Sequence, residues 1–454
     1  MTTTDRATVL AGLGELLPGL EELYLDLHRN PELSFAEHRT AGKLADRLRE
    51  AGYEVHTGIG GTGVAGVLRN GDGPVVMLRA DIDALPVAEK TGLPYASEVR
   101  APNPDGDEVP VMHACGHDMH ATWLDGAARL LAGGRDGWRG TVIVVYQPGE
   151  EVGEGAETMV RDGLFDLVGT PAVVLGQHVV PGPAGWVLTR PGVLMAATDS
   201  LRIVLHGRGG HGSRPETTVD PAVLAASVVM RLQTIVSREI AATEQAVVTV
   251  GSMHVGTAAN VIAEEAVLEV NVRTFDEQVR RRVLAAIERI VQGEAAAAGA
   301  PRPPEITPIA TFPVTSNDEG ANRTLTEAFT AHFGADRTIE APLVTGSEDF
   351  GEFGRAAGAP SCSGWSVALT RTSCSPRWPR AGSSGTSRRT TRRGSRRCCT
   401  RRCGPGWRRW SWPRSRFCRW VVAGSGHDRK RPDPRRQLRP AVGGRHPPAP
   451  AQDR

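Results

Sequence analysis

The sequence predicts an α/β protein in which a mixed-sheet domain carries an inserted, ferredoxin-like α+β sandwich. Residues 1–194 alternate between helical and strand patterns, residues 195–303 follow the order β-α-β-β-α, and residues 304–362 return to strand and helix. Alternation is typical of a sheet with helices packed on it, and the second order is typical of a small sandwich. We therefore expect one sheet domain that is interrupted by a second domain.

The first domain is predicted from local periodicity. Amphipathic patterns predict helices over residues 10–33, 37–51 and 117–131. Apolar runs predict buried strands over residues 75–78, 141–146 and 172–175. Polar residues that can bind metal lie next to these strands or follow them, which is where open α/β sheets place their sites.

The inserted domain has a different pattern. Strands are expected over residues 200–206, 246–250 and 266–273, and helices over residues 221–236 and 277–298. No internal repeat is present.

The most informative stretch reads Met-His-Ala-Cys-Gly-His-Asp-Met-His and places Cys115, His117 and His120 within six positions. Thiolates, imidazoles and carboxylates are ligands of divalent metals and are costly to crowd together without one. Two further clusters of such groups follow, at residues 147–151 and 176–178. Together they indicate a two-metal hydrolytic site.

Paired acidic residues support this chemistry. Glu150 and Glu151 cannot both point the same way from an extended turn. One can bind a metal while the other takes a proton from the attacking water. Asp81 and Asp83 follow a buried strand, where they either orient a ligating histidine or cap the next segment. His211 lies in a Gly-rich loop, where it either reaches a substrate oxyanion or is merely exposed.

Composition excludes several other classes. The 40% hydrophobic and 23% charged residues are ordinary for a soluble globular protein, and no run of 18 apolar residues predicts a membrane segment. The N-terminus has no basic region followed by an apolar stretch, so a cytoplasmic location is expected. Only Cys115 precedes Cys362 among the seven cysteines, which argues against a disulfide framework.

Six motifs, in order, make the chain similar to the M20 metallopeptidase family. They occupy residues 79–86, 112–120, 147–151, 209–215, 259–262 and 345–350. The branch that they most resemble contains amidohydrolases such as hippurate hydrolase, N-acyl-amino-acid hydrolases and the plant auxin-conjugate hydrolases. The resemblance implies a metallohydrolase catalytic domain with an inserted lid domain, two divalent ions (Mn or Zn), and hydrolysis of a small N-acyl amino acid. It also implies a possible homodimer through the lid domain.

The same resemblance implies roles for single residues. The residues that resemble metal ligands are Cys115, His117, Glu151 and His178. Glu150 resembles the general base, while His211 and Asn260, and more weakly Arg273, resemble lid residues that contact substrate. Asp81 is expected to support catalysis by orienting a ligand. A dipeptidase or carboxypeptidase of the same architecture and a non-catalytic pseudoenzyme are the alternatives.

Residues 363–454 have a different chemistry from the rest. They hold 24 Lys and Arg and three acidic residues, whereas residues 1–362 hold 29 Lys and Arg and 48 acidic residues. The family's fifth ligand, a His in an Asn-His-Ser-Pro-like motif, is absent from the sequence as written. Read two bases later, the codons of residues 388–394 permit Ala-Asn-His-Ser-Pro-Arg-Phe. We therefore infer a frameshift near residues 361–364.

Two consequences follow from this inference. We expect residues 363–454 to form no packed domain, and the chain as written to hydrolyse poorly. The composition favours an out-of-frame tail over a basic nucleic-acid-binding tail, so no nucleic-acid partner is expected.

Overall fold

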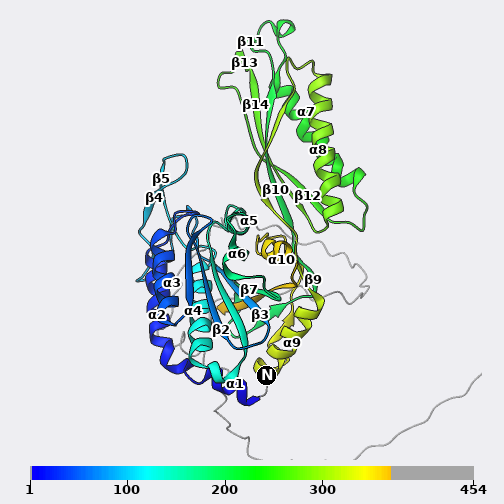
Figure 1. The fold of residues 1–454 in the computed structure, drawn as a ribbon. Coiled ribbons are helices and arrows are strands. Elements are labelled where there is room, and N and C mark those ends of the chain that lie inside the picture. The colour runs from blue at the N-terminus through cyan, green and yellow to red at the C-terminus, as the bar shows by residue number, and fades with distance from the viewer. Residues whose placement is uncertain (1–2, 370–454) are drawn as a thin grey trace, which may run out of the picture.

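The structure is a computed structural model that describes residues 3–369. Figure 1 shows two lobes, one built on a broad sheet with helices around it and one that stands on it as a long, narrow sheet backed by two helices. We call the first the sheet domain and the second, residues 197–312, the lid domain. The predicted class, a mixed sheet with an inserted α+β sandwich, is confirmed.

An eight-stranded sheet forms the centre of the sheet domain. Its strands are β1 (Glu54–Ile59), β2 (Gly63–Asn70), β3 (Val75–Asp81), β6 (Gly140–Gln147), β7 (Val173–Pro183), β8 (Val187–Thr189), β17 (Thr338–Glu340) and β18 (Ser361–Leu369). They lie in the order β1-β2-β6-β3-β7-β18-β8-β17. The central pairs β6–β3, β3–β7 and β7–β18 are parallel, and β1–β2, β2–β6 and β18–β8 are antiparallel. Parallel central strands are buried on both faces, which explains why apolar runs predicted β3 and β6.

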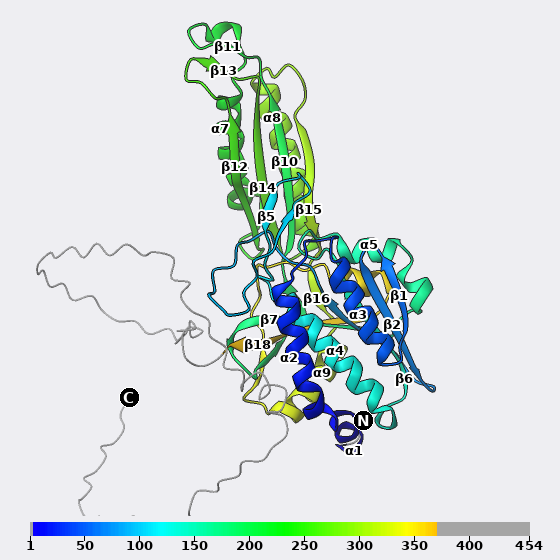
Figure 2. The same ribbon diagram turned by 90° about the vertical axis from the view of Figure 1, so that its left-hand side faces the viewer.

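Helices cover both faces of this sheet (Figure 2). They are α2 (Leu13–Arg29), α3 (His38–Glu50), α4 (His117–Gly133), α5 (Gly155–Arg161), α6 (Leu164–Val168) and α10 (Gly351–Ala357). The helices α2, α3 and α4 pack on one face, where Leu27 and Leu44 are fully buried. The helices α5, α6 and α10 pack on the other, with Met159 and Phe353 at its centre. Each such burial stabilises the fold by about 1.5–3 kcal/mol.

Further elements complete or connect these parts. They are α1 (Thr3–Leu10), β4 (Arg100–Pro102), β5 (Glu108–Pro110), a 3-10 turn (Arg135–Gly137), β9 (Gly192–Met195), β16 (Thr315–Asn317) and α9 (Glu319–Phe333). The helix predicted over residues 10–33 ends earlier, at Arg29, because Pro31 disfavours helical geometry at the residue before it.

The lid domain is a ferredoxin-like sandwich. Its main elements are β10 (Ala197–His206), α7 (Pro221–Thr234), β12 (Ala246–Val255), β14 (Glu265–Thr274), α8 (Glu277–Ala297) and β15 (Glu305–Phe312). The strands form an antiparallel sheet in the order β12-β14-β10-β15. Two short strands, β11 (Gly210–His211) and β13 (Val261–Ile262), pair at the tip, near a 3-10 turn (Pro215–Thr217); a π-helical turn (Ile235–Glu239) follows α7.

Two predicted boundaries differ from the structure. The lid was expected to end at residue 303, but β15 continues its sheet to Phe312; this strand lies at the sheet edge, and its mostly exposed residues give no clear apolar alternation. The tail was expected to begin at residue 363, but β18 runs to Leu369 between β7 and β8, with Trp365 buried. Residues 370–454, which hold the rest of the predicted tail, lie outside the described residues. Within the described part, no helix is long and apolar enough to cross a membrane.

Candidate metal centre

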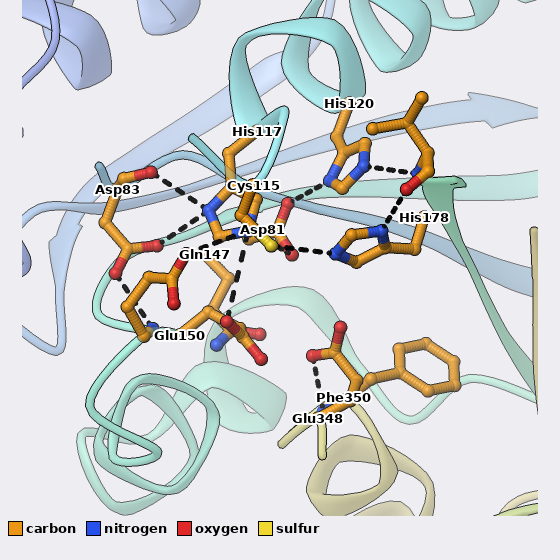
Figure 3. Close-up of polar contacts among 12 residues, drawn as sticks. Asp81, Asp83, Cys115, His117, His120, Gln147, Glu150, His178, Glu348 and Phe350 are labelled. Atoms are coloured by element: carbon orange, nitrogen blue, oxygen red, sulfur yellow. Dashed lines mark hydrogen bonds and ion pairs between the residues drawn. The ribbon is translucent and has the colours of Figure 1, made fainter. Parts of the chain in front are cut away.

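Four segments of the sheet domain meet at one edge of its sheet (Figure 3). Strand β3 ends at Asp81, β6 ends at Gln147, β7 carries His178, and α4 begins at His117. Because β3 lies parallel to both β6 and β7, the residues at these strand ends are brought together. Strand β7 is longer than the predicted 172–175, so His178 lies within the strand and not after its end.

Cys115 and His178 contact each other across this edge. The Cys115 Sγ lies 3.4 Å from the His178 Nε2, and the His178 Nδ1 donates to the Val179 carbonyl at 2.7 Å. The Nε2 lone pair of His178 is therefore directed at the thiol. Gly116 makes this approach possible, since its φ is 86° and a Cβ there would lie 2.3 Å from the Val179 side chain.

His117 is oriented by Asp83. Its Nδ1 lies 2.9 Å from the Asp83 backbone carbonyl and 3.1 Å from the Asp83 carboxylate, so Nδ1 carries the proton and donates. The His117 Nε2 is buried and has no hydrogen-bond partner among the described residues, and the same holds for the Glu151 Oε1, 3.8 Å away. Orphaned buried atoms are costly in a folded protein unless a ligand uses them.

The turn after β6 directs two carboxylates at His117. Glu150 and Glu151 approach its Nε2 to 3.9 and 3.8 Å. We had expected an extended turn from which the two side chains diverge, but hydrogen bonds from Gly153 to the Glu150 carbonyl and from Gly155 to the Gly149 carbonyl close the segment tightly. The tight turn lets both carboxylates reach the same imidazole.

His120 uses both ring nitrogens within the protein. The Val179 N–H donates to the His120 Nε2 at 2.7 Å, so the His120 Nδ1 donates to Asp81 at 2.5 Å. The other Asp81 oxygen accepts from Arg79 at 2.8 Å and lies 3.7 Å from the His117 Nε2. His120 thus braces the centre and leaves no nitrogen for a metal, while Asp81 lies beside His117.

A second carboxylate pair, Glu348 and Asp349, completes the cluster. Arg79, buried beneath it, donates to Glu348 at 2.8 Å and to Asp349 at 3.1 Å, and Gln147 donates to Asp349 at 2.8 Å. Carboxylate oxygens of Glu150, Glu348 and Asp349 lie within 4.8 Å of one another. The sequence predicted a motif at residues 345–350 but no role for these two acids. Two adjacent acids directly before an apolar Phe were the pattern that could have indicated one.

The electrostatics of the cluster favour cations. Burial, together with Glu348 and Asp349, raises the pKa of Glu150 well above its usual value. Burial also raises the pKa of Glu151 to about 7 and lowers that of His178 to about 4. A bound cation would favour the ionised form of these buried carboxylates, and the His178 imidazole already stays neutral, as a metal ligand must.

The donor set fits more than one divalent ion. Within the described residues, the groups whose donor atoms lie within 4.8 Å of one another are Cys115–His117–His178, Asp81–His117–His120, His117–Glu150–Glu151 and Glu150–Glu348–Asp349. His120 belongs to the second group by distance only, because both of its ring nitrogens are hydrogen-bonded. Thiolate, imidazole and carboxylate groups are the side chains that bind divalent metal ions. The structure therefore brings together all four residues that resembled metal ligands.

The lid residues lie elsewhere. His211 and Asn260 are exposed at the tip of the lid domain, the end farthest from the sheet domain (Figures 1 and 2). Arg273 lies near the other end of β14, where it donates to the Thr345 carbonyl of the sheet domain. The ten residues of β14 separate these positions by roughly 30 Å. The three predicted substrate contacts thus lie at opposite ends of the lid domain.

Comparison with known proteins gives consistent matches. The sequence profile of peptidase family M20/M25/M40 matches residues 77–376. The chain is 37% identical over 332 residues to an N-acetylcysteine deacetylase of Bacillus subtilis, which covers 72% of this chain and 82% of that protein. It is 39% identical over 338 residues to the hippurate hydrolase of Campylobacter jejuni, covering 73% and 84%. A solved dinuclear metal-binding M20-family peptidase from Bacillus subtilis superposes with a TM-score of 0.63 at 33% identity, covering 78% and 89%.

Proposed function

Because the chain belongs to peptidase family M20/M25/M40 and is a hydrolase of amide bonds, we propose that it cleaves small N-acyl amino acids with two divalent ions. The observation that carries this proposal is the convergence of Cys115, His117 and His178 with the Glu150–Glu151 turn at one buried sheet edge. The relatives named for deacetylation of N-acetylcysteine and for hydrolysis of hippurate support the substrate class.

We propose that Cys115, His117, Glu151 and His178 hold the ions, which are Mn or Zn. The orphaned His117 Nε2 and Glu151 Oε1 support these assignments, because each is buried and aimed at the cluster. When bound, such ions lower the pKa of a water molecule and polarise the amide carbonyl. Asp83 keeps His117 in place, as carboxylates behind ligating histidines commonly do, whereas Asp81 lies on the Nε2 side of the ring, 3.7 Å away.

Glu150 is the proton carrier in this proposal. It is 5% exposed and lies between His117 and the Glu348–Asp349 pair. Its carboxylate accepts a proton from the attacking water as the C–O bond forms, and it then delivers that proton to the amide nitrogen as the C–N bond breaks. The products are the carboxylate of the acyl group and a free amino acid.

Substrate contacts come from both ends of a lid in this proposal. Arg273, at the base, presents a guanidinium that suits the free carboxylate of an N-acyl amino acid. His211 and Asn260 lie too far along their own lid to join it, so we propose that they act on the substrate of a partner copy in a homodimer joined through lid domains. The homodimer and a cytoplasmic location remain predictions.

The test compares two chains. One is the chain as written, and the other, the repaired chain, is read two bases later from about codon 363. Each is loaded with Mn²⁺ and assayed for amine released from hippurate, N-acetylcysteine and a dipeptide. We expect the repaired chain to hydrolyse the N-acyl amino acids and the written chain to hydrolyse them poorly, because it lacks the fifth ligand.

Each other outcome has a meaning. Preference for the dipeptide would favour the dipeptidase or carboxypeptidase alternative. A repaired chain that binds two ions but hydrolyses nothing would contradict the proposed activity. A written chain that binds no ions would favour the pseudoenzyme for that chain. Equal activity and metal content in both chains would show that the tail is no lesion.

A further inference from the structure

Glu37, the residue before α3, has a fully buried side chain. Its Oε1 accepts the backbone N–H of Phe35 at 2.9 Å and that of Gly149 at 3.0 Å, and its Oε2 accepts the Thr62 hydroxyl at 2.5 Å. In residues 3–369 it forms no ion pair with Lys, Arg or His. A buried carboxylate without a cation is costly, so these three donors must define its position closely.

Phe35 holds an unusual backbone conformation beside it. Its φ is 61°, and within the described residues it is the one non-glycine residue with a positive φ. Most side chains avoid this region because the Cβ crowds the backbone. The conformation places the Phe35 ring against Gly149, where an added Cβ would lie 2.6–3.0 Å from three ring atoms. The ring and the Glu37 carboxylate therefore contact the same glycine.

Ser34 reaches the other side of the same turn. Its hydroxyl donates to an Asp83 oxygen at 2.7 Å, and that oxygen also accepts the Glu151 N–H at 3.0 Å. Residues 34–37 thus hold the turn at two points. Phe35 and Glu37 contact Gly149, just before the two acids, and Ser34 acts on Glu151 through Asp83. The segment and the turn are 112 residues apart at the Glu37–Gly149 contact, so this is a tertiary arrangement and not a local one.

We infer that Glu37 is a positioning residue, whose carboxylate fixes the turn that presents Glu150 and Glu151 to the metal centre. It contacts neither of these side chains, and it acts through the Gly149 backbone. The functional consequence rests on the proposed function, because it takes Glu150 as the proton carrier and Glu151 as a ligand. The structural part, that Glu37 holds the turn, does not depend on the proposed function.

The first measurement is amide hydrogen exchange on the metal-free full chain, followed in peptides that cover residues 147–155. Glu37→Ala should speed exchange at Gly149 by about tenfold or more, because the acceptor of this buried N–H is lost, and exchange at Glu151, which Asp83 still accepts, should rise less. Glu32→Ala is the matched control. Glu32 also accepts two backbone N–H groups, from Arg39 and Thr40, but it does not contact the turn.

Two more variants keep the test sharp. Glu37→Gln retains one oxygen that can accept both N–H groups, so it should stay within about threefold of the wild type. Glu37→Asp keeps the charge but shortens the side chain by one methylene, so its carboxylate can no longer reach the Gly149 N–H, and it should speed exchange in the turn even if Glu37→Ala does not fold. Unchanged exchange in folded Glu37→Ala, or in Glu37→Asp where the first does not fold, would overturn the inference. A Gln variant as exposed as the Ala variant would refute the acceptor role.

The second measurement follows Co²⁺ binding through its visible absorption, with the same variants. Glu37→Ala should weaken Co²⁺ binding about tenfold and change the absorption bands, whereas Glu32→Ala should lower thermal stability and leave the bands unchanged. Unchanged affinity and bands in Glu37→Ala would overturn the functional part. These Co²⁺ measurements use the repaired chain, and if that chain without any variant binds no Co²⁺, the proposed function fails while the exchange experiment still decides whether Glu37 holds the turn.

Discussion

The metal centre and the tip of the lid domain both carry residues that motifs connect with one substrate, yet they are built in opposite ways. At the centre, His117 is buried and held by Asp83, and Asp81 is held by Arg79 and His120. At the tip, His211 is exposed, and among the described residues its ring hydrogen-bonds only with Ser213 in its own loop.

This difference separates two kinds of functional residue. Side chains of the centre are held by one another, at the cost of crowding buried acids around one arginine. The tip residues are not held by such contacts, so they can act only when the tip is placed against a bound substrate. Substitutions in the two regions should therefore impair metal binding and catalysis in different ways.

The largest effect is expected at the centre. Glu150→Gln in the repaired chain should lower kcat by about 10²–10⁴-fold, because the proton carrier is lost. Metal content should stay at the wild-type level, since the proposed ligands remain. Turnover and bound Mn²⁺ are measured on the same sample, and near-normal turnover would remove Glu150 from its proposed role.

At the tip, the loss should be smaller and separable from metal binding. His211→Ala should lower kcat/KM by about 10²-fold in the repaired chain, as for the loss of one oxyanion donor, with unchanged Mn²⁺ content. Mixing this variant with Glu150→Gln should restore part of the activity, because a mixed dimer contains one intact pairing of tip and centre. No recovery in dimers shown to exchange subunits would mean that the tip does not act across copies.

Metal binding should stabilise the fold through the centre alone. Free Mn²⁺ at 100 times its Kd should raise the free energy of unfolding by about 2.7 kcal/mol, read as a higher Tm. His117→Ala should abolish this shift, and His211→Ala should preserve it. A shift that survives in His117→Ala would place the stabilising ion elsewhere in the chain.

The smallest effect concerns pH. Burial raises the pKa of Glu37 to about 7, and Asp83 is the charged neighbour that adds to the shift. A carboxyl group whose pKa is higher in the folded protein than its unfolded value of about 4.3 stabilises the folded state in its protonated form. This stabilisation is complete below a pH of about 4.3 and is lost as the pH rises through about 7.

Glu37→Gln should therefore gain stability relative to the wild type, by about 2 kcal/mol, between pH 4.5 and 7.5 in metal-free protein. Denaturant unfolding at several pH values measures this difference. The exposed lid variant Glu264→Gln is the control and should show no such trend. If the free energies of unfolding of the wild type and of Glu37→Gln change with pH in parallel, the raised pKa of Glu37 would be contradicted.

Local patterns in the sequence were sufficient for much of the fold. Strands β3 and β6, helix α4 and the order of the lid elements follow from periodicity, because each depends on residues near in sequence. The gathering of Cys115, His117, Glu151 and His178 was predicted as well. The placement of their three clusters beside expected strands indicated a common site, and the resemblance selected these four residues.

Other features depend on distant contacts and gave no local signal. Strand β7 continues through Gly176 and Pro181, which interrupt its apolar pattern, because β18 pairs along it. The double engagement of His120 depends on Val179, 59 residues away. The positive φ of Phe35 follows from packing on Gly149, and the sequence around Phe35 gives no sign of it.

The position of β18 has a consequence for how the protein is made. It is the last strand described, yet it lies inside the sheet, between β7 and β8. During synthesis, β8 and β17 therefore cannot join the rest of the sheet until residues 361–369 have left the ribosome. Until then, the edge of β7 that pairs with β18 stays without a partner strand. A change of reading frame near residues 361–364 would alter this joining strand, so it would reduce the yield of correctly folded chains before it affected any catalytic step.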